Sequence, residues 1–460
     1  DIQQMIRICC LNPVYQSSCH RTQCCCYKLN FEGDNGVVQF GKIRKFDIFI
    51  LCIALYIIAY TGISIAGIGL LDIIVLTLWG IAIYLNNFHL IFCKNNLAVF
   101  YILIVMLGYF LHGNIGSGFW KTLELILILL VIPHYLDTER KYWRMMDIIL
   151  SIGGVLAILG LIETISEVNI FQSIAGIGQS SAINNYRFGL RRSQGFCNNF
   201  INYGAFLGML SCLAIYRIAN QKRSKKHVDI IIYVLLLLNM ISTLSRGVIL
   251  FFGIAHLILW WKAGVLKRID RIFKIIGSIA IVGVILQLFG VPVIEGINNI
   301  FYMIAVIFDS SYEASLSSSF GSNVGGIGNR LDLFGWIYDA VKNDLFLGVG
   351  YSTRFSKHLN GGYYKTSIEN TYLAQLYYTG ILGLSGLLVF LLGNIKKAID
   401  TKQRMTNESK LSYESMFIVL TVGYMLTMLT FNVQSDFRLY YVLVGLLYSR
   451  KMILREKNFH

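Results

Sequence analysis

Residues 228–262 read VDIIIYVLLLLNMISTLSRGVILFFGIAHLILWWK. Two apolar runs, each close to the length of a membrane-crossing helix, flank the polar stretch STLSRG at 242–247. This pattern predicts two antiparallel transmembrane helices with a short connection. Arg246 stands at the start of the second run, where a charge is costly unless it faces a cavity or a partner. Arg246 is therefore the first candidate functional residue.

The composition extends the membrane interpretation to the whole chain. Apolar side chains make up 55% of the 460 residues and charged ones only 14%, against about 25% in soluble domains. This excludes a soluble globular enzyme. The net charge of +15 does not indicate nucleic-acid binding, because the basic residues lie in short clusters between apolar runs, as in cytosolic loops.

Apolar runs near 20 residues long predict an all-α integral membrane protein with about twelve transmembrane helices. The even number places both termini on one side, and the basic clusters make that side cytosolic. The predicted spans are residues 46–64, 67–86, 97–112, 120–136, 146–163, 200–219, 228–244, 247–262, 274–293, 371–394, 414–431 and 436–449.

Four regions follow from this division of the chain. Six of the ten cysteines lie in the first 26 residues, without the paired spacings of zinc sites or a disulfide framework, so no metal is predicted. That part is a cytosolic tail or a non-native start. The regions are a cysteine-rich N-terminal tail (1–43), spans one to nine (44–293), a large extracytoplasmic loop (294–370), and spans ten to twelve with a cytosolic tail (371–460).

The loop 294–370 carries Trp336, Tyr338, Phe346, Tyr351 and Phe355, so we expect it to pack as a small lobe. Its segment DLFGWIYDAVKN at 332–343 predicts an amphipathic helix. The apolar residues at helical spacing are Leu333, Phe334, Ile337 and Val341.

Several arginines fall on the predicted outer side, where the positive-inside rule does not explain them. Arginine stays charged and binds phosphate oxygens bidentately, so their convergence would suit a diphosphate. Alternatives are a solvated surface for Arg187 and Arg354, a partner for Asp332 in the case of Arg330, and a pair with Asp436 for Arg438. The outer arginines are Arg187, Arg191, Arg192, Arg246, Arg330, Arg354 and Arg438.

Two residues on the same side are candidates for proton transfer. Glu369 directly precedes a predicted span, where it could act as a general base or simply cap the helix. His358 is a second candidate base or an ordinary loop residue. Phosphate-binding loops, nucleophile elbows and metal-binding motifs do not occur in the sequence, so no cofactor is predicted.

Three stretches resemble the O-antigen ligase and polysaccharide polymerase superfamily, including its Wzy-like polymerases. They are RRSQGFCNNFINYGAF at 191–206, TLSRGVIL around Arg246, and the region from Arg330 to the stretch ENTYLAQLYYTGILG at 369–383. The last contains the family's spaced motif residues Asn370, Gly380 and Gly383. The resemblance covers residues 187–385.

The resemblance implies metal-free transfer of a glycan from a polyprenyl-diphosphate carrier, at the outer face of a bacterial cytoplasmic membrane. It implicates Arg246 and Arg330 in binding the donor diphosphate, with Arg191 or Arg192 as further donors. From their outer placement alone, Arg354 is a further candidate for the diphosphate, and Glu369 or His358 is the candidate for accepting the acceptor proton. Expected partners are the lipid-linked donor and acceptor, membrane lipid, a flippase and chain-length regulators.

Glu369 stands where ligases of this superfamily commonly carry histidine, which favours a repeat-unit polymerase for O-antigen, capsule or exopolysaccharide. A ligase that moves glycan to lipid, wall polymer or protein is the first alternative. A flippase or transporter of lipid-linked sugars is the second, although the paired half-repeats and deeply placed polar residues typical of transporters are not seen in the sequence.

Overall fold

The structure is a computed structural model, and it is mostly helical over the residues that it describes. It describes residues 45–59, 63–65, 68–85, 92–174, 186–187, 190–197, 199–220, 226–264, 277, 287, 327–351, 353, 355–358, 364–365, 367–403, 411–432 and 438–459. The predicted N-terminal tail and the loop residues 294–326 therefore lie outside the described residues.

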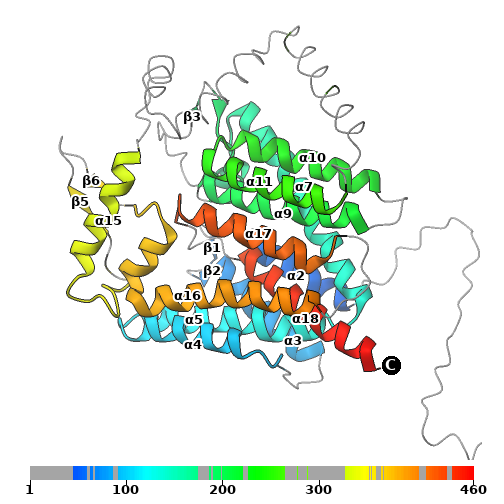
Figure 1. Cartoon of the computed structure of the whole chain (residues 1–460), viewed down its shortest axis with the longest axis horizontal. Coiled ribbons are helices and arrows are strands. Elements are labelled where there is room, and N and C mark those ends of the chain that lie inside the picture. Colours follow the sequence, from blue (N-terminus) through cyan, green and yellow to red (C-terminus); the bar gives the residue numbers. More distant parts are fainter. Residues whose placement is uncertain are drawn as a thin grey trace, which may run out of the picture. The chain divides into compact units, whose positions relative to one another are not determined.

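The helices follow one another with short connections over most of the described chain (Figure 1). They are α2 (Lys45–Ile58), α3 (Leu70–Leu85), α4 (Asn96–Phe110), α5 (Ile115–Ile126), the π-helical turn η2 (Leu127–Val131), α6 (Ile132–Tyr135), α7 (Glu139–Ser166), α8 (Ile170–Ile174), α9 (Phe200–Asn220), α10 (Lys226–Ser242), α11 (Arg246–Lys262), α15 (Ile327–Val341), α16 (Thr371–Gln403), α17 (Tyr413–Met428) and α18 (Arg438–Phe459).

In the part of the chain that the structure describes, three antiparallel pairs of two-residue strands accompany the helices. They are β1 (Ser64–Ile65) with β2 (Ile68–Gly69), β3 (Tyr186–Arg187) with β4 (Leu190–Arg191), and β5 (Lys357–His358) with β6 (Tyr364–Lys365).

A described helix, or a continuous run of helices, coincides with each predicted span except the ninth, 274–293, which lies outside the described residues apart from 277 and 287. Among the described residues, four helical stretches are long and apolar enough to cross a membrane: Ile115–Tyr135, Glu139–Ser166, Phe200–Asn220 and Thr371–Gln403. Shorter apolar helices accompany them. The structure thus supports a multi-pass helical membrane protein.

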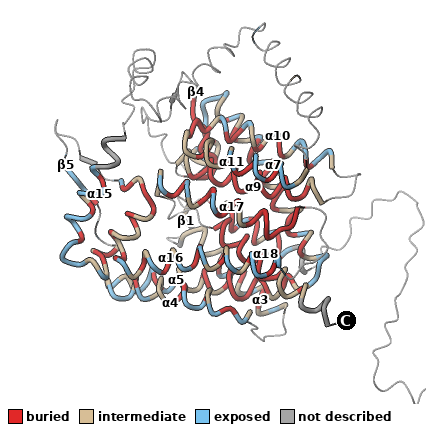
Figure 2. The backbone as a smooth tube through the Cα atoms, viewed as in Figure 1, coloured by how far each residue is buried: buried red, intermediate tan, exposed pale blue. Residues whose placement is uncertain are grey.

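One apolar core joins the helices, and the buried residues lie between them rather than on the outer faces (Figure 2). Helices α7, α9 and α10 pack together, α11 packs on α9 and α17, and α16 packs on α17 and α4. The exposed faces of these helices are also rich in large apolar residues, such as Leu103, Val155 and Leu257, as expected of a surface in lipid.

The segment predicted as an amphipathic helix is α15. Its residues Leu333, Ile337 and Val341 are buried in a second apolar cluster, which also contains Ala374 and Tyr377 of α16. The prediction is wrong for Phe334, whose side chain is 52% exposed. Phe334 follows Leu333 directly, so it lies about 100° around the helix from the buried stripe.

Candidate functional site

Several connections between helices gather at one end of the bundle, which we call the loop end. It contains residues 111–114, 190–197, 243–245 and 429–431, on the left of the bundle in Figure 1. Alternating topology predicts these connections on the same, extracytoplasmic side. Their gathering at one end agrees with that alternation.

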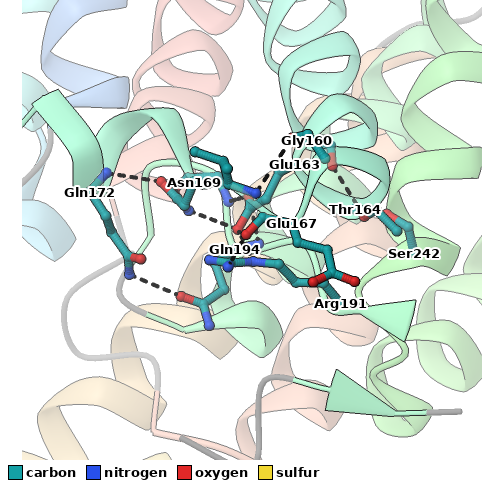
Figure 3. Close-up of polar contacts among 12 residues, drawn as sticks. Gly160, Glu163, Thr164, Glu167, Asn169, Gln172, Arg191, Gln194 and Ser242 are labelled. Atoms are coloured by element: carbon teal, nitrogen blue, oxygen red, sulfur yellow. Dashed lines mark hydrogen bonds and ion pairs between the residues drawn. The ribbon is translucent and has the colours of Figure 1, made fainter. Parts of the chain in front are cut away.

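Arg191 pairs with the carboxylate of Glu163, near the end of α7 (Figure 3). The two side chains are almost fully buried, and Arg191 Nε lies 3.6 Å from Glu163 Oε1. Glu163 Oε2 also accepts from the backbone N–H groups of Gln194 (3.1 Å) and Gly195 (2.9 Å). Asn169 Nδ2 donates to Glu163 Oε1 at 2.8 Å. One carboxylate thus satisfies a cation and three N–H donors.

This pairing explains how residues 191–197 can be buried without being helical. Buried backbone amides need partners, and a carboxylate supplies them where no regular ladder exists. Gly160 of α7 makes the close approach possible, since a Cβ there would lie 2.6 Å from Ser193 Oγ and 2.3 Å from Asn239 Nδ2. The segment therefore lies between α7 and α10.

The guanidinium of Arg192 lies at the end of α10. Its Nε donates to the carbonyl of Thr243 at 2.9 Å, and its Nη2 lies 3.3 Å from both the Leu244 carbonyl and Ser245 Oγ. Its Cζ lies 3.0 Å from the centre of the Phe200 ring. Basic groups at helix C-termini are favourable because carbonyls there lack helical partners. Arg192 therefore binds the turn that leads into α11.

Arg246 is the first residue of α11, with Ser245 as the N-cap, and its side chain is half-buried. The next residue, Gly247, lies against the end of α17, where a Cβ would approach Thr430 Oγ1 to 2.8 Å. The start of α11 and the end of α17 are thus neighbours. The position predicted from the apolar runs is confirmed as a helix start, and its role stays a prediction.

Asn370 and Thr371, at the start of α16, bind the same end of α17. Asn370 Nδ2 donates to the Leu429 carbonyl at 3.1 Å, and Thr371 Oγ1 donates to the Phe431 carbonyl at 2.7 Å. Asn370 also caps α16, accepting from Leu373 N at 3.0 Å. Half-buried Glu369 directly precedes Asn370. Residues 429–431 therefore lie between the segments that carry Arg246 and Glu369.

The second motif residue, Gly380, interrupts α16. It has φ 64° and ψ −162°, a conformation that essentially only glycine adopts, and α16 changes direction there (Figure 1). The freed amides of Ile381 and Leu382 donate to the carbonyls of Leu345 (2.9 Å) and Phe346 (3.2 Å). Residues 345–350 therefore lie against this break. Gly383, one turn further, faces Thr379, whose side chain would clash with a Cβ.

His112 and a stack of tyrosines hold the same loop. One ring nitrogen of His112 lies 2.7 Å from the Gly108 carbonyl, and the other lies 3.2 Å from the Gly348 carbonyl. Tyr351 stacks between Tyr109 and Tyr378, with ring centres 4.3 and 5.3 Å apart. Burial raises the pKa of the Tyr351 phenol well above its usual range. Tyr351 therefore keeps its proton at neutral pH.

The structure describes some of the remaining predicted residues only in part. Arg330 belongs to α15, but its side chain lies outside the described residues, as does Arg354. His358 is exposed in β5. Arg438 is buried and donates to the carbonyls of Tyr56 and Ala59 at the end of α2. Among the described residues, no group of three His, Cys, Asp or Glu side chains could hold a metal ion.

Glu163, Asn169 and His112 are not among the functional residues predicted from the sequence. The available signal was weak, since Glu163 and His112 are polar residues at the ends of apolar runs, where such residues are common. Their partners lie far along the chain and meet them only in the folded structure.

Residues 231–388 match a family model described as O-antigen ligase. The match includes Arg246, Arg330 and the motif from Glu369 to Gly383, so it confirms the superfamily resemblance over this part of the chain. Residues 191–206 lie outside it. No match was found among curated proteins.

Proposed function

We propose that the protein is a polysaccharide polymerase, on the premise that residues 231–388 match a family model described as O-antigen ligase. It transfers a glycan from a polyprenyl-diphosphate carrier to a hydroxyl of another lipid-linked repeat unit. The reaction takes place at the outer face of the bacterial cytoplasmic membrane. A flippase and chain-length regulators act with it.

The acceptor hydroxyl attacks the anomeric carbon, a new C–O bond forms, and the bond to the diphosphate breaks. Arg246 and Arg330, with Arg354 as a further donor, bind the diphosphate. Fixed cations outside bulk water stabilise the charge that accumulates on this leaving group. Glu369 accepts the acceptor proton, and His358 is the alternative base. No metal takes part.

One observation supports this proposal: the turn 429–431 contacts both the start of α11 and the start of α16. Thr430 lies against Gly247, and Leu429 accepts from Asn370. Arg246 and Glu369, which are distant in sequence, therefore belong to segments that contact the same turn. A cation for a leaving group and a carboxylate for a proton are the two parts that this reaction needs.

A ligase is the second candidate, because the matching family model is described as an O-antigen ligase. The two reactions share the donor and differ in the acceptor. The polymerase is preferred on a single position, Glu369 in place of the histidine that is common in ligases.

The test supplies purified protein in nanodiscs with polyprenyl-diphosphate-linked repeat units and a chelator, and resolves the glycans by chain length. We expect a ladder from the wild type and a loss of about 100-fold in kcat/KM for Arg246→Ala, as for other residues that stabilise developing charge. Lys262→Ala is the matched control, since Lys262 is a cation at the other end of α11.

An unchanged ladder from Arg246→Ala would remove Arg246 from the site. If the wild type binds the donor but makes no ladder, addition of a lipid or polymer acceptor separates a ligase from a flippase. Only the ligase would then form product.

A further inference from the structure

Two consecutive arginines, Arg191 and Arg192, each bind a turn that contains a non-glycine residue with positive φ. Among the described residues, the non-glycine residues with positive φ are Glu167 (φ 59°), after α7, and Leu244 (φ 49°), after α10. Arg191 donates to the carbonyl of Glu167, and Arg192 lies 3.3 Å from that of Leu244. This conformation is unfavourable for a non-glycine residue, so the surroundings must hold it.

The turn at Leu244 decides where α11 begins. Residues 243–245 join α10 to α11, and Arg246 is the next residue. Arg192 contacts each residue of this turn, through two carbonyls and one hydroxyl. A change in the turn would move the start of α11, and with it Arg246.

Arg192 is itself held in place by its neighbours. Ser193 N donates to the Ser242 carbonyl at 3.3 Å, and the next two amides bind Glu163. The Arg192 side chain is only 5% exposed and lies over the Phe200 ring. Its fork of donors is thus directed at the end of α10.

We propose that Arg192 is a positioning residue, which fixes the turn 243–245 and thereby places Arg246 for the donor diphosphate without touching the diphosphate itself. The inference rests on the proposed diphosphate site, but not on which acceptor is used. It replaces the diphosphate-binding role that the family resemblance implies for Arg192.

A double-mutant cycle between Arg192→Gln and Arg246→Ala tests this. The first readout is binding of polyprenyl diphosphate alone to protein in nanodiscs, and the second is kcat/KM for the ladder. We expect Arg192→Gln to weaken both by about 10-fold, and the double variant to match Arg246→Ala within about twofold, because the two residues act as a unit. If the loss in the double variant were the product of the losses in the two single variants, the proposal would be overturned.

Arg192→Lys distinguishes a positioning role of Arg192 from a direct effect of its charge on the diphosphate. Lysine keeps the cation but lacks the planar fork that reaches the turn, so we expect it to behave like glutamine. Substantial rescue by lysine would indicate a cation acting on the diphosphate and would overturn the proposal.

If the Arg192 variants do not fold, Ser245→Ala tests the positioning role of Arg192 instead. It removes one acceptor of Arg192 and leaves no unpaired charge, and we expect a loss of about threefold that disappears in the Arg246→Ala background. A loss that persists there would contradict the inference. A wild type that binds the carrier but makes no ladder overturns the polymerase alone, whereas one that does not bind the carrier overturns both proposals.

Discussion

Two stretches of non-helical backbone, residues 191–197 at the loop end and the break at Gly380 in α16, pair their polar groups in different ways. In residues 191–197, two amides are satisfied by one side chain, the carboxylate of Glu163. At the break in α16, the amides after Gly380 are satisfied by backbone carbonyls of residues 345 and 346.

This difference shows what each stretch depends on. Where water is scarce, every backbone polar group needs a partner in the protein. The first stretch depends on the identity of one acidic side chain. The second depends on a backbone conformation, and hence on glycine at position 380. Substitutions can therefore disrupt the two stretches separately.

The largest effect is expected for Glu163→Ala. It removes the acceptor of two amides and leaves the Arg191 charge buried without its carboxylate, at a cost of about 3–5 kcal/mol in the free energy of unfolding. An unfolding titration in mixed micelles measures this. The control is Glu139→Gln, at an exposed position at the start of the same helix. A loss below about 1 kcal/mol would show that residues 191–197 do not need the carboxylate.

Gly380→Ala comes next. A Cβ would lie 2.4 Å from the carbonyl carbon and oxygen of Phe346, and the backbone conformation alone costs a non-glycine residue about 1–3 kcal/mol. We expect lower stability and lost activity. Gly253→Ala in α11 is the control, because a Cβ there meets nothing within 4 Å. If Gly380→Ala and Gly253→Ala had the same stability and activity, the break in α16 would not require glycine at position 380.

The smallest effect is expected for His112→Ala, which removes a side-chain contact from the second stretch. The loss of the bond to the Gly348 carbonyl costs about 0.5–1.5 kcal/mol in the same titration. His227→Ala, at an exposed position in α10, is the control. A loss as large as that of Glu163→Ala would contradict the view that backbone bonds hold this stretch.

Helices could be predicted from the sequence because their signal is local. Apolar runs of sufficient length located α9, α10 and α11 within a few residues, and the polar interruption before Arg246 located a helix start. The spaced residues Asn370, Gly380 and Gly383 were found as a motif. That Gly380 breaks the helix depends on a dihedral angle, which the sequence pattern does not express.

Contacts between distant segments could not be predicted. The stretch RRSQGFC has the composition of an exposed loop, yet residues 191–197 are buried because Glu163 and Asn169 satisfy them. The same limit applies to Arg192, whose partners lie some 50 residues further along the chain. The pattern of apolar runs and basic clusters predicted that Arg192 lies on the outer side of the membrane. It did not predict which groups the guanidinium of Arg192 binds.

The π-helical turn η2, within the run Ile115–Tyr135, has a consequence for how this protein can tolerate insertions and deletions. A π turn contains about one residue more than an α turn, so it changes the rotational phase of everything that follows. Before η2, Glu124 Oε1 accepts a hydrogen bond from the Tyr56 hydroxyl at 2.5 Å. After η2, the Tyr135 hydroxyl donates to the Ala82 carbonyl. In a regular α-helix with the same number of residues, these two faces would be offset by about a further 100°, whereas removal of one residue from η2 would restore an α turn and leave both faces in place. A one-residue deletion within η2 should therefore be tolerated better than one elsewhere in the run Ile115–Tyr135.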